Sequence, residues 1–455
     1  MKNGKRSSFS GKLGYVLAAA GASVGLGNIW RFPYLAAKYG GGIFLIIYIV
    51  LALTFGYTMI VAETAIGRMT RKSPVGAFKS FGKKKWLSFG GWINAVIPVL
   101  IVPYYSVIGG WVIKYLVEYF RGNAKLLAED GYFTDFISNG VSTELCFVAF
   151  CAFTLIIIFA GVQNGIERVS KIMMPILIVL SVIIAVYSVT RPGAFAGVKY
   201  FLVPNVKNFS WMTVVSAMGQ MFYSLSIAMG ILITFGSYMK KDTAIEDSTR
   251  NVEIFDTGIA IMAGLMIIPA VFAFSGGDPD TLQAGPSLMF ITIPKVFQNM
   301  GFGTVIGIVF FLLVLFAAVT SSIALTESAV STFEDELGWG RKKATVLVGV
   351  IMLALGSLSS LGYGPLAGIK IIGMQFLDLF DFLTNSVMMP IAALITSLLV
   401  SRVVGIDKIE EEIIHGESAF RRKKVFVVMI KYLCPVFAII ILLSSVANAL
   451  GWIKM

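Results

Sequence analysis

Gly21-Ala-Ser-Val-Gly-Leu-Gly-Asn-Ile-Trp-Arg-Phe-Pro33 interrupts the first long apolar segment of the chain, roughly residues 13 to 50. A helix in lipid rarely tolerates this composition, because no water replaces a broken backbone hydrogen bond at that depth. We therefore predict that Ala22 to Gly27 is unwound at membrane depth, where the freed backbone groups line a cavity for a small molecule and a cation. The alternative is a kinked, glycine-rich helix used for close packing.

The composition predicts a polytopic membrane protein. Of the 455 residues, 57% are apolar and 14% are charged, which excludes a soluble globular domain. The formal net charge is +12. The basic residues stand in short loops between apolar runs, so we interpret them as topogenic charges and expect no nucleic-acid partner. His415 is the only histidine, which excludes a His-based catalytic triad and a multi-His metal site.

Windows of about 20 apolar residues predict eleven membrane spans. They are roughly 13–37, 42–69, 88–120, 144–161, 167–189, 212–238, 250–274, 302–333, 343–360, 376–401 and 425–449. Lysine and arginine concentrate in the loops that an inside N-terminus would place in the cytoplasm. This predicts a multi-pass protein of the plasma (inner) membrane with a cytoplasmic N-terminus and, for an odd number of spans, an extracytoplasmic C-terminus.

Two loops between the predicted spans carry further signals. The outer loop 275–301 contains Gly276-Gly-Asp-Pro-Asp280 and then an amphipathic run, Ser287 to Phe297, which is too short to span. We interpret it as a lid over the extracellular face. The cytoplasmic loop 402–424 predicts a solvated surface helix, with partner docking as the alternative.

The sixth span repeats the anomaly of the first. Gly219-Gln-Met-Phe-Tyr-Ser-Leu-Ser-Ile-Ala-Met-Gly230 places polar and small residues at mid-membrane. Five spans separate the two breaks, so the second copy enters the membrane in the opposite sense. This predicts a five-plus-five inverted repeat of residues 13–189 and 212–401, followed by a last span at 425–449, within a single transporter domain 1–455.

Two later spans add oxygen-bearing groups. Span eight contains Ala317-Ala-Val-Thr-Ser-Ser322, and span seven contains Asp256. Acids inside the membrane are costly and by default functional. Oxygen ligands without soft donors suit a hard cation. Helix–helix hydrogen bonding would explain Thr320 and Ser321 alone, but the two breaks, the hydroxyls and the acid together indicate a cation-coupled site.

These motifs resemble the neurotransmitter:sodium symporter family over nearly the whole chain. The matching motifs are Gly25-Leu-Gly-Asn-Ile-Trp-Arg-Phe-Pro-Tyr34, Glu63-Thr-Ala-Ile-Gly-Arg68, Tyr104-Tyr105, Gly219-Gln220, Ala284-Gly-Pro-Ser-Leu-Met-Phe-Ile291, Thr320-Ser-Ser322 and Phe333-Glu-Asp-Glu-Leu337. The resemblance implies an all-α leucine-transporter fold with discontinuous first and sixth helices. The predicted count of eleven spans, rather than twelve, is similar to that of the prokaryotic hydrophobic amino-acid transporters of the family.

The resemblance also implies two sodium sites. The first would consist of the Ser23 carbonyl, the side chains of Asn28, Ser224 and Asp256, and the substrate carboxylate. The second would consist of the carbonyls of Gly21, Val24 and Ala317 and the hydroxyls of Thr320 and Ser321. Because the substrate carboxylate is itself a ligand, substrate and sodium binding would be coupled.

Monoamine carriers of this family have an acid at the position of Gly25, so the resemblance implies a substrate that brings its own carboxylate. That carboxylate would meet the amides of the break, around Gly27, and the Tyr105 hydroxyl. The ammonium would meet groups around Ser23, Tyr223, Ser224 and Ser321. The side-chain pocket would be lined by Ala22, Leu26, Ile101, Ser226, Met229 and Leu325.

The implied pocket holds no charge, so it favours neutral, hydrophobic or aromatic amino acids. Met229 replaces an aromatic residue and is adaptable, whereas Ala228 stands where glycine is usual and would restrict the room. Members that require chloride have Asn at the position of Asp256 and Ser at that of Ala260. We therefore predict chloride-independent transport, and proton countertransport stays open.

Charge pairs suggest the gates. Arg31 and Asp381 would close the outer side above Tyr105 and Tyr223, with Gln220 nearby. Arg6 and Asp335, supported by Phe9 and Tyr238, would close the inner side. For Arg6 a topogenic charge is the alternative, and Phe9 replaces the usual Trp of the family, which leaves the strength of this inner gate open.

The predicted function is sodium-coupled import of amino acids by alternating access. An amino-acid sensor or a channel on the same scaffold is the alternative. We expect no enzyme, because no HExxH or P-loop pattern occurs. The preferred amino acid and the oligomeric state, monomer or homodimer, stay open.

Overall fold

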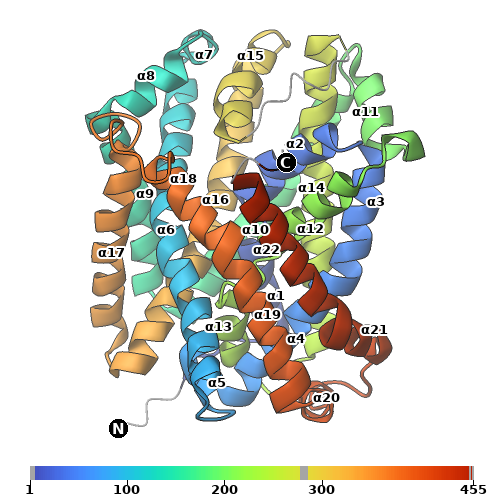
Figure 1. Cartoon of the computed structure of the whole chain (residues 1–455). Helices are drawn as coiled ribbons and strands as arrows, with labels where there is room; N and C mark the ends of the chain where they lie inside the picture. The colour runs from blue at the N-terminus through green and yellow to red at the C-terminus, as the bar shows by residue number, and fades with distance from the viewer. Residues whose placement is uncertain (1–5, 277–284, 450–451, 453–455) are drawn as a thin grey trace.

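A computed structural model describes residues 6–276, 285–449 and 452, and throughout this described part every regular element is a helix (Figure 1). The prediction of an all-α protein is confirmed. The helices that can cross a membrane unbroken contain the following elements: α3 Gly42–Leu51, α4 Tyr57–Thr70, α6 Lys85–Phe120, α9 Gly140–Phe159, α10 Arg168–Val189, α14 Ile245–Ser275, α16 Gly303–Leu337, α17 Arg341–Leu361, α18 Phe376–Asp381, α19 Met389–Leu399, α21 Lys423–Val428 and α22 Cys434–Ala449.

Single π-helical turns continue or join several of these elements: η2 Ala52–Gly56, η3 Val162–Glu167, η7 Phe382–Met388, η8 Val400–Val404 and η9 Met429–Leu433. Short helices lie between the spans: α5 Pro74–Lys79, α7 Ala124–Leu127, α8 Tyr132–Ser138, α11 Ala194–Leu202, η4 Val206–Asn208, η6 Leu288–Thr292, α15 Ile293–Gln298 and α20 Ile406–Ile414. In Figure 1, α5 and α20 lie at one end of the bundle, and α7, α8 and α15 lie at the other. We call these the inner and outer ends, following the predicted orientation.

The first span is broken, as predicted. Helix α1 (Lys12–Ser23) ends inside the bundle, and the chain resumes as η1 (Gly27–Arg31) and α2 (Phe32–Lys38) at an angle of 52°. The interruption is narrower than the predicted Ala22 to Gly27. The helical hydrogen bonding continues up to Val24, whose amide donates to the Ala20 carbonyl at 2.7 Å, so only 24–26 lies between the two helical parts.

The sixth predicted span is also broken. Helix α12 (Trp211–Ser224) and helix α13 (Ile231–Tyr238) are separated by residues 225–230. Ser226, Ala228 and Gly230 have φ angles of +53°, +60° and +69°. This left-handed backbone is unfavourable for Ser and Ala, and such strain concentrates at functional sites.

The described residues contain nine unbroken helices that are long and apolar enough to cross a membrane, and the bent pair of α1 and η1–α2 makes ten. The segment α12–α13 would be the eleventh span, but its two parts are short and widely interrupted. The count of eleven therefore stays a prediction, as do the boundaries of the two repeats.

The two loop predictions have different outcomes. Gly276 ends α14, but residues 277–284 of the predicted lid lie outside the described residues. The amphipathic run forms η6 and α15 at the outer end, and the Tyr115 hydroxyl of α6 donates to the Phe290 carbonyl at 2.7 Å. At the inner end α20 is a helix, but it is not fully solvated, because Ile409, Glu412 and Ile413 are buried. Arg68 of α4 binds the Glu412 carboxylate at 2.7 Å and thereby holds α20 against the bundle.

Candidate functional site

A central cavity with an empty volume of about 340 Å³ lies where the two interrupted segments meet. All twelve residues predicted to bind substrate line it: Ala22, Ser23, Leu26, Gly27, Ile101, Tyr105, Tyr223, Ser224, Ser226, Met229, Ser321 and Leu325. Gly25 and Asn28 complete the lining. These residues come from the first break with α1 and η1, from α6, from α12 with the 225–230 segment, and from α16, so tertiary packing brings four distant parts of the chain together.

The backbone of the first break faces polar groups of neighbouring helices. The Leu26 amide donates to the Tyr105 hydroxyl at 3.3 Å, and the Gly27 carbonyl accepts from the Gln220 amide at 3.0 Å. The Ser226 hydroxyl donates to the Ala22 carbonyl at 2.9 Å and links the two breaks directly. Gln220, predicted to lie near the outer gate, is buried and holds α12 to η1.

A fully buried acid lies beside the cavity. Asp256 Oδ1 accepts from Asn28 and Ser224, both at 2.8 Å, and Oδ2 accepts from the Tyr48 hydroxyl at 2.8 Å. Three of the predicted ligands of the first cation site, Asn28, Ser224 and Asp256, are thus in direct contact, and Ser23 lines the same cavity. Tyr48 was missed by the sequence analysis. Its only signal was a phenol in an apolar span, which needs a buried hydrogen-bond partner.

The ligands predicted for the second cation site also converge. The Ser321 hydroxyl lies 3.2 Å from the Gly21 carbonyl and 3.5 Å from the Val24 carbonyl. The Thr320 hydroxyl lies 3.2 Å from the Ala317 carbonyl. Gly21 permits this approach, because a Cβ atom there would lie 3.1 Å from the Thr320 side chain.

The donor chemistry of the two clusters fits an alkali cation. The second cluster offers only neutral carbonyl and hydroxyl oxygens, and the first adds one carboxylate, Asp256. Among the described residues no group of three or more His, Cys, Asp or Glu side chains could hold a metal ion. Such oxygen-rich, thiolate-free sites suit a hard cation rather than zinc or copper.

A larger outer cavity, with an empty volume of about 1700 Å³, lies above the central one and contains Arg31, Tyr104, Tyr223 and Asp381. The Arg31 guanidinium lies over the Tyr223 ring, 5.3 Å from its centroid. Asp381 accepts from Tyr104 at 3.2 Å and from Asn385 at 2.6 Å. The predicted outer gate pair thus lies in one cavity, but its two charges form no ion pair in this conformation.

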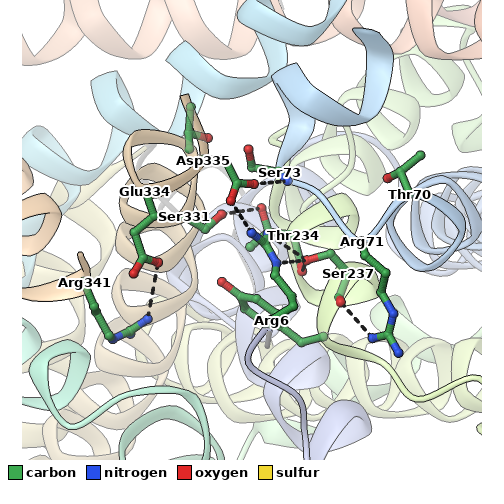
Figure 2. A network of polar contacts seen from close by, with 12 residues as sticks. Arg6, Thr70, Arg71, Ser73, Thr234, Ser237, Ser331, Glu334, Asp335 and Arg341 are labelled. Carbon is green, nitrogen blue, oxygen red and sulfur yellow. Dashed lines mark hydrogen bonds and ion pairs between the residues drawn. The ribbon is translucent and has the colours of Figure 1, made fainter. Parts of the chain in front are cut away.

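A polar network surrounds Arg6 and Asp335, the charge pair predicted for the inner gate (Figure 2). Arg6 forms an ion pair with Asp335 and donates to the Ser237 hydroxyl at 2.9 Å. The other Asp335 oxygen accepts from the Ser73 amide at 2.7 Å. Arg6 also lies over the Tyr238 ring, 5.0 Å from its centroid.

Phe9 and Tyr238, which were predicted to support the Arg6–Asp335 pair, lie beside it, and two further residues join them. Phe9 is buried and packs edge-on against Tyr238, and its amide donates to the Tyr238 carbonyl at 3.1 Å. The Tyr238 hydroxyl donates to Glu327 at 2.7 Å, and Glu327 is paired with Arg341 at 2.6 Å. Glu327 and Arg341 were not predicted for this network, because they stand fourteen positions apart and no local pattern joins them.

The predicted role of the Arg6–Asp335 ion pair in the inner gate can be tested by mutation, with the Lys79–Glu336 ion pair as the control. Asp335→Ala leaves the Arg6 charge and the Ser73 amide without their acceptor, so the inner end should open more often. We expect the reaction of a thiol reagent with a cysteine placed at the buried Ser331 to become about tenfold faster, which corresponds to a bias of about 1.4 kcal/mol. Glu336→Ala is the control, because Glu336 pairs with the half-exposed Lys79. Equal rates of thiol reaction in Asp335→Ala and Glu336→Ala would contradict the assignment of Arg6 and Asp335 to the inner gate.

Known proteins that resemble this chain belong to the family whose motifs the sequence carries. The family model for the sodium:neurotransmitter symporter family matches residues 6–130 and 131–452. The chain is 34% identical to the sodium-dependent transporter YhdH of Bacillus subtilis over 450 residues, covering 98% of this chain and 99% of that protein. It is 31% identical to a sodium-dependent transporter of Haemophilus influenzae over 460 residues, covering 97% and 99% of the two chains.

A solved structure shares the fold. The crystal structure of MhsT in complex with L-phenylalanine matches with a TM-score of 0.86 and 35% identity, covering 97% of this chain and 100% of that one. The prediction of a leucine-transporter fold with discontinuous first and sixth helices is confirmed. With a family model that spans almost every residue, close relatives over their full length and a shared fold, the chain belongs to the sodium:neurotransmitter symporter family.

Proposed function

We propose that this protein is a sodium-coupled symporter that imports neutral, hydrophobic or aromatic amino acids across the plasma (inner) membrane by alternating access. The observation that carries the proposal is the central cavity, which has polar backbone at one side, apolar side chains at the other and two oxygen clusters beside it. The structural relative MhsT binds L-phenylalanine, which supports an amino acid of this class.

The cavity divides into two parts that match the two parts of such a substrate. The Leu26 amide, the Tyr105 hydroxyl and the region of Gly27 would receive the carboxylate. Ser23, Tyr223, Ser224 and Ser321 lie where the ammonium would be held. Ile101, Met229 and Leu325 offer no charge, so an acidic or basic side chain would lose its hydration without gaining a partner.

Coupling follows from shared ligands. The carboxylate of the substrate would complete the first cation site beside Asn28 and Asp256, so each ligand would raise the affinity for the other. The second cluster, around Ser321 and Thr320, joins α1 to α16 and would hold these helices together when sodium is bound.

The conformation supports alternating access. In this proposal the large outer cavity and the separated charges of Arg31 and Asp381 would leave the outer side accessible, while the Arg6–Asp335 network would close the inner side. We infer that the repeats 13–189 and 212–401 move relative to each other about the central site. In this scheme the N-terminus is cytoplasmic and the C-terminus extracytoplasmic.

Chloride is not needed in this proposal. Asp256 supplies a fixed negative charge beside the first cation cluster, and the buried Ala260 offers no hydroxyl to bind an anion. An anion near Asp256 would be repelled at close range in a medium of low polarity.

Uptake into proteoliposomes tests the proposal. Radiolabelled phenylalanine should accumulate against its gradient only with an inward sodium gradient, and replacement of chloride by gluconate should leave the rate unchanged. Competition by each proteinogenic amino acid should single out neutral, apolar side chains. Flux without accumulation would indicate a channel, binding without flux would indicate a sensor, and strict chloride dependence would overturn the role of Asp256.

A further inference from the structure

A second hollow lies on the flank of the bundle, away from the central site. It is a groove with an empty volume of about 800 Å³ between the outer parts of α9 and α17. Its lining includes Val141, Glu144, Leu145, Val148, Leu361 and Pro365. Figure 1 shows α17 at the edge of the bundle, with the loop that follows it at the outer end.

This groove opens toward the membrane. Helices α9 and α17 both meet the length and hydropathy of a membrane span. On α9 the side chains of Val141, Leu145 and Val148 are 72%, 67% and 41% exposed, which in a spanning helix means that they face lipid tails. The molecules that reach the groove most readily are therefore those of the bilayer itself.

One acid distinguishes the groove from an ordinary lipid-facing surface. Glu144 is the charged member of the lining, and its Oε1 atom accepts a hydrogen bond from the Ser357 hydroxyl of α17. Its Oε2 atom is buried and has no hydrogen-bond partner among the described residues. A carboxylate in a membrane span with one oxygen left unpaired is costly and by default marks a functional site.

The depth of this carboxylate identifies the complementary group. Glu144 stands four residues after the start of α9, and Ser357 four residues before the end of α17, so both lie about 6 Å inside the helix ends. At this depth the polar headgroups meet the acyl chains of a bilayer. A cationic headgroup that donates hydrogen bonds would pair with Oε2 once the Glu144 side chain turns this oxygen toward the groove.

We propose that this groove binds a phospholipid with a primary ammonium headgroup, such as phosphatidylethanolamine. The Glu144 side chain turns Oε2 from its buried position toward the groove, where the ammonium donates to it, and the acyl chains lie along Leu145, Val148 and Leu361. Phosphatidylcholine cannot make this contact, because its quaternary nitrogen carries no hydrogen. Phosphatidylglycerol lacks the positive charge and is repelled by the carboxylate.

Native mass spectrometry of the purified full-length chain tests the proposal. The protein is titrated separately with phosphatidylethanolamine, phosphatidylcholine and phosphatidylglycerol of identical acyl chains. We expect phosphatidylethanolamine to bind about tenfold more tightly than phosphatidylcholine, which is the size of one charge-assisted hydrogen bond. Glu144→Gln should remove this preference. The control Glu129→Gln should retain it, because Glu129 is exposed in the outer loop between α7 and α8.

A second variant tests the groove by shape. Leu145→Trp fills the groove with a lipid-compatible side chain and keeps the carboxylate, so it should weaken binding of all phospholipids at this site. Thermal unfolding in detergent verifies that each variant is folded. If Glu144→Gln does not fold, lipid binding by Leu145→Trp still decides whether the groove is the lipid site. Equal binding of the three lipids, an unchanged preference in Glu144→Gln, or dimers that depend on Glu144 would overturn the proposal. Transport is not measured, so the outcome is independent of the proposed function.

Discussion

Replacing Gly25 by alanine is expected to abolish measurable sodium-dependent substrate binding while the protein stays folded. A Cβ atom at this position would lie 2.6 Å from the Ser321 hydroxyl and 3.0 Å from the Tyr105 hydroxyl. Both hydroxyls line the central cavity, so the added methyl group occupies the space assigned to the substrate carboxylate. Overpacking alone costs about 1–3 kcal/mol, and the lost ligand contacts add to it. We expect the affinity to fall at least about a hundredfold in a scintillation proximity assay.

A matched glycine gives the control for this variant. Gly258 lies in α14 and has no neighbouring atom within 4 Å of the position that a Cβ would take. Gly258→Ala should therefore bind substrate as the unmodified chain does and unfold at an equal or higher temperature. Normal binding by Gly25→Ala would show that the substrate does not approach this part of the broken helix.

Asp256→Asn is expected to lower the apparent sodium affinity and make transport depend on an added anion. The carboxylate accepts hydrogen bonds from Asn28, Ser224 and Tyr48 and is the acid of the first cation cluster. In the proposed function this carboxylate is also the charged partner of a bound sodium ion, and removing one partner of a buried charge pair costs about 3–5 kcal/mol. We therefore expect uptake in chloride-free medium to fall at least about a hundredfold at limiting sodium.

Two further variants define the origin of this effect. Asp247→Asn removes an acid from the same helix, but Asp247 lies at the inner end, where it pairs with Lys12 and Arg250, so sodium affinity should be unchanged. Adding Ala260→Ser to Asp256→Asn should restore uptake when chloride is present, because the new hydroxyl can help to bind the anion. Full activity of Asp256→Asn without chloride would refute the assigned role of the carboxylate.

Much of this protein follows from local composition, because breaking a helix inside lipid is costly and leaves a mark in the sequence. Glycines 21, 25 and 27 beside Arg31 predicted the first break, and the polar residues of 219–230 predicted the second. Asp256 and the hydroxyls of 320–322 stood out for the same reason, since each is polar in an apolar span. The roles of individual site residues came from the family resemblance to these motifs.

Tertiary structure decided which distant groups touch. Tyr48 reaches Asp256 across 208 positions, and Gln220 reaches the Gly27 carbonyl across 193, contacts that no sequence spacing encodes. The same holds for Glu327 with Tyr238, and for the groove at Glu144, which exists only because α9 and α17 pack side by side. The separation of Arg31 from Asp381 likewise reflects the conformation adopted. Helix breaks are determined by the hydrogen bonding of neighbouring residues, whereas side-chain partners depend on how whole helices pack, and that is set by the sum of many weak contacts.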